Sequence, residues 1–206
     1  MKKLFFMSLL LLTILSASCL AAGPARADEY TPEEIKKEAR ELGRRLEMPP
    51  DKLAEMLKVL GAALSDPWYK QASQSMPTSA VFVFMAGEGG VVVKFMTGQG
   101  LISFKNGRLD APLFIRSWSA GLQAGGAAQY GVGLVMGLTR EENLGGDYTG
   151  GFTKAVAGDE ATPNGSVFSQ SDPITGFADH LVYIISSARG FYAGVGGAKV
   201  TITPNW

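Results

Sequence analysis

Few side chains in this sequence have the types and spacing that catalysis requires. The chain has a single histidine, His180, which excludes a site built on several histidines and an HExxH motif. We expect His180, beside Asp179 at the start of a strand, to be a surface or half-buried residue. Segment 117–121, Ser-Trp-Ser-Ala-Gly, lacks the first glycine of a GxSxG nucleophile elbow. A serine hydrolase that uses Ser119 and His180 is therefore the disfavoured alternative, and we predict no catalytic residues.

Motifs that hold nucleotides or metals are also missing from the sequence. Gly131 and Gly133 are followed by Gly137, one residue too late for GxGxxG, and no helix-forming segment comes next. GxxxxGK[ST] does not occur anywhere in the chain. We therefore predict no metal site and no cofactor. Glycines among short apolar runs are instead expected at bulges, at tight turns and where two backbones approach closely.

A ladder of basic residues is the first candidate binding surface. Lys36, Arg40 and Arg44 are spaced four apart, so a helix places them along one side. Like charges at this spacing cost stability unless something anionic faces them, and interfacial helices often have such a basic face. The alternative is a solvated helix face with pairs of opposite charge four residues apart: Glu33 with Lys37, and Glu41 with Arg45.

Aromatic residues outside the helices supply a second candidate surface. Trp118 lies near Arg116 at the end of a predicted strand, whereas Trp68 and Tyr69 fall in the connection between helices and sheet. An exposed tryptophan beside a cation suits the interface between membrane and water. The alternative is that these rings belong to the core or its rim. The predicted lipid-binding residues are therefore Lys36, Arg40, Arg44, Arg116 and Trp118.

Residues 1–27 have the pattern of a secretion signal. Lys2 and Lys3 precede an apolar run over residues 4–15, and Ala-Arg-Ala at 25–27 forms an A-x-A cleavage site. The apolar run is shorter than the roughly 20 residues that a membrane-spanning helix needs. Cleavage before Cys19, with lipid attached to it, is the alternative, although Ser16 occupies the place of the usual apolar residue. We predict an exported protein, periplasmic or peripherally associated with the envelope.

Composition sets the size and charge of the remaining chain. Residues 28–206 are enough for one buried core and too few to indicate two domains. Without Lys2, Lys3 and Arg26, the formal count is 16 basic against 19 acidic residues, a net charge of −3. General nucleic-acid binding needs a broad positive field, so we exclude nucleic acid as a partner.

Helices precede strands in the predicted domain. Thr31-Pro32-Glu33-Glu34 combines an N-cap, a proline at the first helical position and a capping box. Asp51 caps a second helix, which stops at Asp66-Pro67, so the helical region spans residues 31–66. Strands follow over residues 80–203, and Asn106-Gly107 is a hairpin turn signal. Segment 147–172 is polar and glycine-rich, which predicts surface loops.

This order of elements predicts the class of fold. Helices followed by strands indicate an α+β domain over residues 28–206, with a mainly antiparallel, glycine-rich sheet. We expect the sheet to form a sandwich or to curl into a partly open barrel. The predicted strands are 80–85, 90–96, 99–104, 113–119, 122–127, 132–138, 180–188 and 191–203.

The strand region resembles the SYLF domain, a lipid-binding domain of yeast and animal proteins linked to actin and membranes that also has bacterial envelope members. The resemblance extends in order from residue 80 to residue 195, and Gly121-Leu-Gln-Ala-Gly-Gly126 is its most specific run. The other similar segments are Ala80-Val-Phe-Val-Phe, Gly87-Glu-Gly-Gly-Val-Val-Val93, Ala111-Pro-Leu-Phe-Ile115, Val132-Gly-Leu-Val-Met136 and Ser187-Ala-Arg-Gly-Phe-Tyr-Ala-Gly-Val195.

The resemblance implies a protein that binds lipid or phosphoinositide without catalysis. Actin binding belongs to the eukaryotic members, and we do not expect it of a protein exported by a bacterium. The expected partner is therefore an anionic lipid or phospholipid surface. The alternative is an interaction module that pairs with an envelope protein through the edge of the glycine-rich sheet.

Overall fold

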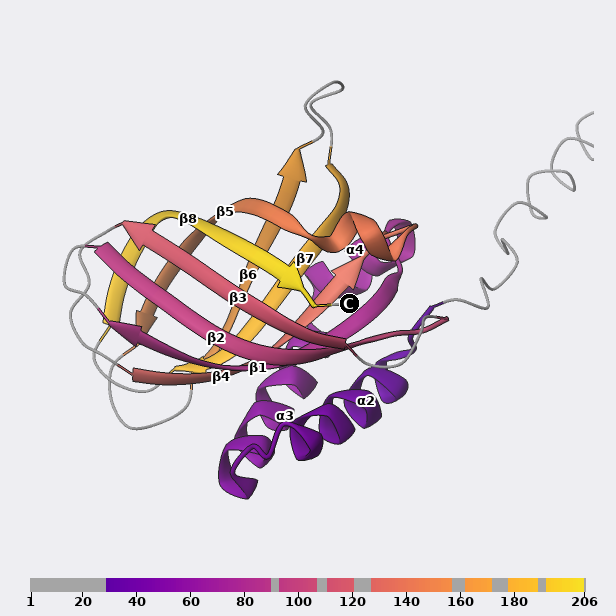
Figure 1. The fold of residues 1–206 in the computed structure, drawn as a ribbon, viewed down its shortest axis with the longest axis horizontal. Coiled ribbons are helices and arrows are strands. Elements are labelled where there is room, and N and C mark those ends of the chain that lie inside the picture. The colour runs from indigo at the N-terminus through magenta and orange to yellow at the C-terminus, as the bar shows by residue number, and fades with distance from the viewer. Residues whose placement is uncertain are drawn as a thin grey trace, which may run out of the picture.

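In the described part of the chain, three α-helices precede eight β-strands that close into a barrel (Figure 1). The computed structural model describes residues 29–89, 93–106, 111–120, 127–156, 162–171, 178–188 and 192–205. The predicted signal, Cys19 and the run 121–126 lie outside these residues. The α+β class predicted from the sequence is confirmed. No helix in the described ranges is both long enough and apolar enough to cross a bilayer.

Helix α2 (Pro32–Arg45) begins with the capping box that the sequence predicts. The Thr31 hydroxyl accepts a hydrogen bond from the Glu34 backbone N–H, and the Glu34 carboxylate accepts one from the Thr31 N–H at 2.9 Å. These bonds satisfy two of the N–H groups that have no partner within a helix. Ile35, Ala39 and Leu42 share the buried face of the helix, so the periodicity of the sequence determines which side faces the barrel.

Two further helices, α3 (Pro50–Ser65) and α4 (Pro67–Ser75), complete the helical layer. The sequence predicts a cap at Asp51 and a connection after Asp66-Pro67, but Asp51 lies inside α3, whose N-cap is Pro49, and residues 67–75 form α4. Asp66 ends α3 with an extended backbone, and its side chain then accepts a hydrogen bond from the Trp68 N–H at 2.7 Å. Pro67 cannot continue α3 but fits the first position of the next helix, so one residue pair stops one helix and starts another.

All neighbouring strands of the barrel are antiparallel, in the order β1-β2-β3-β8-β5-β6-β7-β4. Because β4 returns to pair with β1, every strand has a neighbour on both sides, and the barrel is closed rather than partly open. The alternative of an envelope protein that pairs with a sheet edge finds no free edge strand in this order, although β5 and β6 pair with each other at only two positions. The strands are β1 (Thr78–Gly89), β2 (Val93–Phe104), β3 (Ala111–Ala120), β4 (Ala127–Met136), β5 (Gly146–Val156), β6 (Thr162–Ser171), β7 (Ala178–Ala188) and β8 (Tyr192–Pro204).

Several predicted strand boundaries were also wrong. Residues 93–104 form one strand, β2, although Thr97-Gly98 suggested a break there. Residues 146–156 and 162–171 form β5 and β6, where the sequence predicted polar loops. The helical turn η1 (Glu141–Leu144) precedes β5. Strands β2 and β3, which flank the hairpin turn predicted at Asn106-Gly107, are antiparallel neighbours, whereas Gly107 of the turn lies outside the described residues.

Side chains alternate between the inside of the barrel and its outside. On β1, Phe82 and Phe84 point into the interior, whereas Val81 and Val83 belong to a second core beneath the helices. This alternation follows from the two-residue period of a strand. The interior core is closed at one end by η1, where Leu144 is buried against Tyr148. The barrel is thus filled by its own side chains, with a second apolar layer between barrel and helices.

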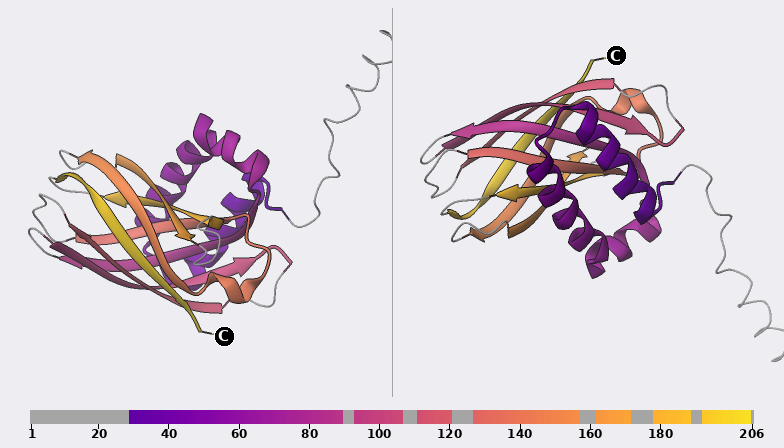
Figure 2. Two further views of the ribbon diagram at one scale, coloured as in Figure 1. Left: turned by 90° about the horizontal axis from the view of Figure 1, so that it is seen from above. Right: turned by 90° about the horizontal axis from the view of Figure 1, so that it is seen from below.

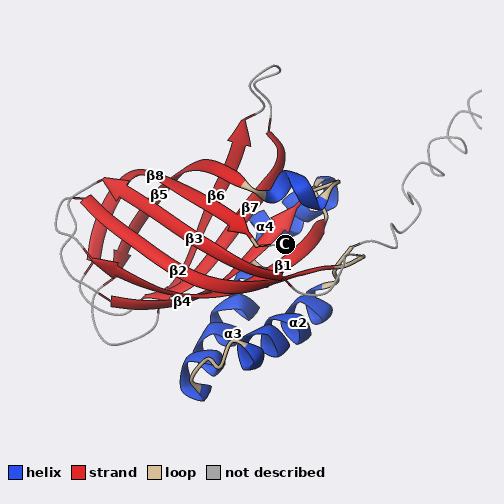
Figure 3. Ribbon diagram, in the orientation of Figure 1, coloured by secondary structure: helices blue, strands red, loops and turns tan. Residues whose placement is uncertain are grey.

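The helices cover only one side of the barrel, as Figures 2 and 3 show. Helix α2 packs on β1 and β2, whereas α3 packs on β4, β6 and β7. Helix α4 is held by buried Tyr69, whose hydroxyl lies 3.0 Å from that of Thr78, and by Trp68, whose ring centroid is 4.9 Å from that of Tyr183. Strands β3, β8 and β5 form the opposite wall, which the helices leave exposed.

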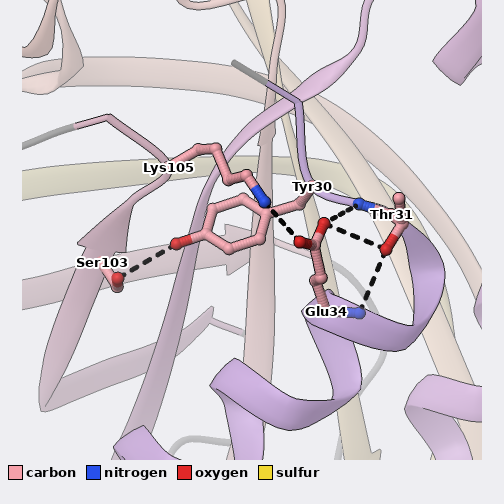
Figure 4. A network of polar contacts seen from close by, with 5 residues as sticks. All are labelled: Tyr30, Thr31, Glu34, Ser103 and Lys105. Carbon is pink, nitrogen blue, oxygen red and sulfur yellow. Dashed lines mark hydrogen bonds and ion pairs between the residues drawn. The ribbon is translucent and has the colours of Figure 1, made fainter. Parts of the chain in front are cut away.

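A polar network fixes α2 to the end of β2 (Figure 4). Lys105 donates to the Glu34 carboxylate at 2.6 Å, and its ammonium lies 5.1 Å from the centre of the Tyr30 ring. The Tyr30 hydroxyl in turn lies 3.1 Å from that of Ser103. Hydrogen bonds from Lys105 and Thr31 lower the pKa of Glu34 to about 2. The N-terminal segment and helix are therefore bound to the barrel by charge as well as by apolar packing.

Candidate functional site

Strand β3 exposes large side chains on the wall that the helices leave bare. Its inward positions Ala111, Leu113 and Ile115 are buried in the barrel interior. The alternate positions face outward: Phe114 is 50% exposed, and Trp118 is 45% exposed. A strand over a barrel core normally places polar residues on its outer face, so two exposed aromatic rings here require an explanation.

Strand β2 adds a third aromatic ring beside them. Phe95 is 65% exposed, and the next outward residues, Thr97 and Gln99, are exposed as well. Further along the strand the outward residues Leu101 and Ser103 are covered, because α2 and Tyr30 pack there. The outer face of β2 therefore changes from covered to exposed along its length, and Phe95 lies at the exposed end.

The strand register brings the three rings together. Phe95 is directly opposite Trp118 across the β2–β3 pair, and Trp118 is opposite Lys199 across the β3–β8 pair. Phe114 lies two outward positions from Trp118 on the same strand. Side chains directly opposite on one face of a sheet have Cβ atoms about 5 Å apart, so Phe95 and Trp118 are in contact range. We call Phe95, Phe114 and Trp118 the aromatic patch.

Cations lie within and beside the aromatic patch. Arg116 is the outward residue between Phe114 and Trp118, is exposed, and forms no ion pair with the described residues. Lys199 is 2.6 Å from the Asp147 carboxylate, which also accepts a hydrogen bond from the Thr201 hydroxyl at 2.6 Å. The Lys199 and Thr201 hydrogen bonds lower the pKa of Asp147. Arg116 is therefore the cation of this wall that has no described carboxylate to neutralise it.

The five residues predicted from the sequence fall into two groups in the structure. Arg116 and Trp118 lie on β3, and their neighbours Phe95 and Phe114 are not among the residues predicted from the sequence. The basic ladder lies on α2, which packs on β1 and β2. Lys36 bonds to Glu33 at 2.9 Å, and Arg44 lies 3.8 Å from Glu41, so both ion pairs form at a spacing of three. The solvated helix face thus accounts for Lys36.

The structure separates the two residues of the hydrolase alternative. Ser119 is near the end of β3, and His180 is near the start of β7. These strands are four apart in either direction around the barrel and run parallel, so the two residues lie on opposite walls and at opposite ends. A Ser–His pair needs hydrogen-bond contact. A hydrolase built on Ser119 and His180 is therefore contradicted.

His180 is buried, which corrects the expectation of a surface or half-buried residue. It is 1% exposed, and its Nε2 lies 2.8 Å from the Tyr148 hydroxyl. That hydroxyl donates its only hydrogen to the Leu144 carbonyl at 2.5 Å, so it accepts from the Nε2–H of His180. The pair ties η1 and β5 to β7 at one end of the barrel, which is a structural role.

A hollow of about 520 Å³ lies where β1 begins and β2 and β4 end. Its volume is within the range of small-molecule sites. Its charged lining residues are Glu29, Arg140 and Glu141, and Arg140 is also 3.9 Å from Glu142. This mixture of charges selects neither anions nor cations, so we regard the aromatic patch as the better candidate.

The comparisons with known proteins give a distant structural likeness only. No protein-family model matches the sequence, and no curated protein matches it. A β-barrel-like, uncharacterised protein from Brucella abortus has 20% sequence identity and a TM-score of 0.48, covering 87% of this chain and 98% of that chain. The virulence-associated protein VapD from Rhodococcus equi has 12% identity and a TM-score of 0.37, covering 62% of this chain and 100% of that chain. The SYLF resemblance thus gains no support from family models.

Proposed function

We propose that this chain is an exported, non-enzymatic protein that binds anionic membrane surfaces through the aromatic patch and Arg116. The observation that carries the proposal is the cluster of three aromatic rings, each about half exposed or more, on β3 and on the end of β2 that the helices leave exposed. Exposed apolar clusters on soluble domains mark interaction sites, whereas scattered apolar residues do not.

The chemistry of the patch fits a lipid interface. Tryptophan rings are stabilised at the level of lipid head groups, and phenylalanine rings are stabilised by burial at the boundary between head groups and acyl chains. Arg116 lies between two of the rings, so insertion of Phe114 and Trp118 would bring its guanidinium to the phosphate groups. Arginine pairs with phosphate through two parallel hydrogen bonds.

The proposal agrees with the SYLF resemblance, which implies lipid binding. The proposed binding residues differ from those predicted from the sequence. Phe95 and Phe114 join Trp118 and Arg116, and Lys36 is assigned to its ion pair with Glu33. Because the net charge of residues 28–206 is −3, attraction to anionic lipid must be local. Salt should weaken such an attraction, since the screening length is about 10 Å at 0.1 M.

Vesicle flotation of residues 28–206 tests this proposal. We expect flotation with vesicles that contain phosphatidylglycerol, little flotation with phosphatidylcholine alone, and weaker flotation as salt increases from low to moderate concentration. Flotation in none of these conditions would overturn the proposal and favour an envelope protein as the partner. Crosslinking in the envelope would then be the next measurement.

Substitutions in the patch test which surface binds. Phe95→Ser with Trp118→Ser removes two exposed rings, and we expect at least about tenfold weaker binding, since 1.4 kcal/mol corresponds to a factor of ten. Trp68→Ser is the matched control, because Trp68 is 39% exposed but lies on α4, on the side of the helices. Equal losses in both variants would contradict the assignment of the patch.

A further inference from the structure

Helices α2 and α3 line an open hollow of about 400 Å³ near the turn that joins them. We call it the α2–α3 hollow. Its lining combines five apolar residues with two cations: Met48, Pro50, Leu53, Ala54 and Leu57, together with Arg40 and Arg44. It lies on the helical layer, whereas the aromatic patch lies on the bare wall of the barrel.

Close packing at one point positions the two helices around this hollow. A Cβ atom at Gly43 would lie 2.6 Å from Leu53 Cδ1, so Leu53 packs against the backbone of α2 at Gly43 and would have to move if a larger residue stood there. After α2 ends, Glu47 adopts a left-handed backbone with φ of 57°, and the chain turns into α3 at Pro50. Met48 is buried in this turn, which supplies an apolar floor.

The two cations of the hollow are available to an anion. Arg40 is exposed and forms no ion pair with the described residues. Arg44 lies 3.8 Å from Glu41, and both side chains are more than half exposed, so water screens this pair strongly. Arg40 and Arg44 are one helical turn apart, which places both guanidinium groups within reach of one anionic group. The apolar floor and the cationic rim are adjacent. A ligand that fills the hollow therefore needs both an apolar part and an anionic group, which water and a simple anion lack.

We propose that the α2–α3 hollow binds a single-chain anionic amphiphile as a monomer, such as a fatty acid. Arg40 and Arg44 hold its head group, and the alkyl chain lies over Met48, Leu53 and Leu57. The volume suits a small amphiphile rather than a phospholipid with two chains, since sites for small molecules start at about 300 Å³. This site is separate from the aromatic patch, so it goes beyond the proposed function and does not depend on it.

Calorimetric titration of residues 28–206 with dodecanoate, below the concentration at which it forms micelles, tests the proposal. We expect saturable binding of dodecanoate to one site. Butanoate, which has the head group without the chain, and dodecyl maltoside, which has the chain without the charge, should each bind at least about tenfold more weakly. Equal binding of dodecyl maltoside would overturn the anionic specificity, and equal binding of butanoate would overturn the role of the apolar floor.

Three variants locate the site on the protein. Ala54→Trp fills the hollow from an exposed helix position, and Arg40→Gln removes one cation; we expect each to weaken dodecanoate binding about tenfold or more. Lys37→Gln is the control, because Lys37 is exposed on α2 and does not line the hollow. Unchanged binding in Ala54→Trp, with its circular dichroism spectrum unaltered, would overturn the proposal. Vesicle flotation of Ala54→Trp should equal that of the unaltered chain, which separates this result from the test of the aromatic patch.

Discussion

The Phe82 side chain lies over the backbone of Gly133 on the neighbouring strand, inside the barrel. The two residues are directly opposite in the β1–β4 register, and a Cβ atom at position 133 would overlap three carbons of the Phe82 ring. Gly131 has the same relationship to Phe84, whose Cζ would lie 2.5 Å from a Cβ atom there. These glycines on β4 leave the room that two aromatic rings occupy, which is the close approach that the strand glycines predicted.

Gly133→Ala should therefore destabilise the barrel. The Phe82 side chain is fully buried, with 0% of its surface exposed, and its ring lies against the backbone of Gly133. The added methyl group must therefore displace the Phe82 ring. Overpacking of this kind costs about 1–3 kcal/mol. Chemical denaturation followed by circular dichroism measures the free energy of unfolding.

Gly87→Ala is the matched control, because a Cβ atom there would meet nothing within 4 Å. We expect its free energy of unfolding to stay the same or rise slightly, since alanine restricts the unfolded chain more than glycine does. Combining Gly133→Ala with Phe82→Leu should cost less than the sum of the two single changes. Simple additivity would argue against the contact between ring and glycine.

The sequence predicts those parts of the fold whose pattern is local. The capping box at Thr31 and the apolar faces of α2 and α3 identify the helices, because these signals depend on residues within one or two turns. Strand β5 was missed because it lies on the bare wall. Among residues 146–150, the part of β5 whose side chains are described, Tyr148 is buried, while its neighbours Asp147 and Thr149 are exposed and make the segment look like a loop.

The aromatic patch shows what a linear pattern leaves out. Trp118 could be chosen from the sequence because a tryptophan near an arginine stands out, but Phe95 lies 23 residues earlier in the chain. Only the register between β2 and β3 places the two rings opposite each other. Exposure also depends on the helices, which cover Ser103 and leave Phe95 bare on the same strand. Register and coverage are tertiary properties, so the sequence alone identified one ring of three.

The ion pair between Glu34 and Lys105 predicts a contribution to stability that acid removes. The pKa of Glu34 is lowered from its ordinary 4.5 to about 2, chiefly by the hydrogen bond from Lys105. A lowered folded-state pKa means that the contribution is complete above pH 4.5 and is lost as the pH falls towards 2. Glu34→Gln should therefore melt at a lower temperature than the unaltered chain at pH 7, and the difference should shrink below pH 4.

Glutamine at position 34 still accepts the capping hydrogen bond from Thr31, so the change isolates the charge. Glu38→Gln on the same helix is the control, because Glu38 forms no ion pair with the described residues. Its melting temperature should follow that of the unaltered chain at each pH. A difference for Glu34→Gln that stays constant from pH 7 to pH 2 would show that the ion pair with Lys105 does not contribute.

The buried pair of Tyr148 and His180 predicts a cost for removing one hydroxyl. Tyr148→Phe keeps the ring in the barrel interior and deletes the hydrogen bonds to the Leu144 carbonyl and to His180 Nε2. Loss of such bonds between buried groups costs about 1–3 kcal/mol. Tyr130→Phe is the control, because Tyr130 is only half-buried and its hydroxyl has no described hydrogen bond. Equal free energies of unfolding in the two variants would refute a structural role for the pair.

Trp118 provides a direct report on how the barrel meets a membrane. The sequence has three tryptophans, at positions 68, 118 and 206, so Trp68→Phe with Trp206→Phe leaves Trp118 as the sole indole. If the aromatic patch enters the lipid interface, its fluorescence should shift to shorter wavelength when phosphatidylglycerol vesicles are added, because the ring leaves water. Bromine-labelled acyl chains should quench it at the same time. The companion protein that keeps only Trp68, on the side of the helices, should show neither change. A shift for Trp68 and none for Trp118 would reverse the orientation and place the helical layer, rather than the bare wall of the barrel, against the membrane.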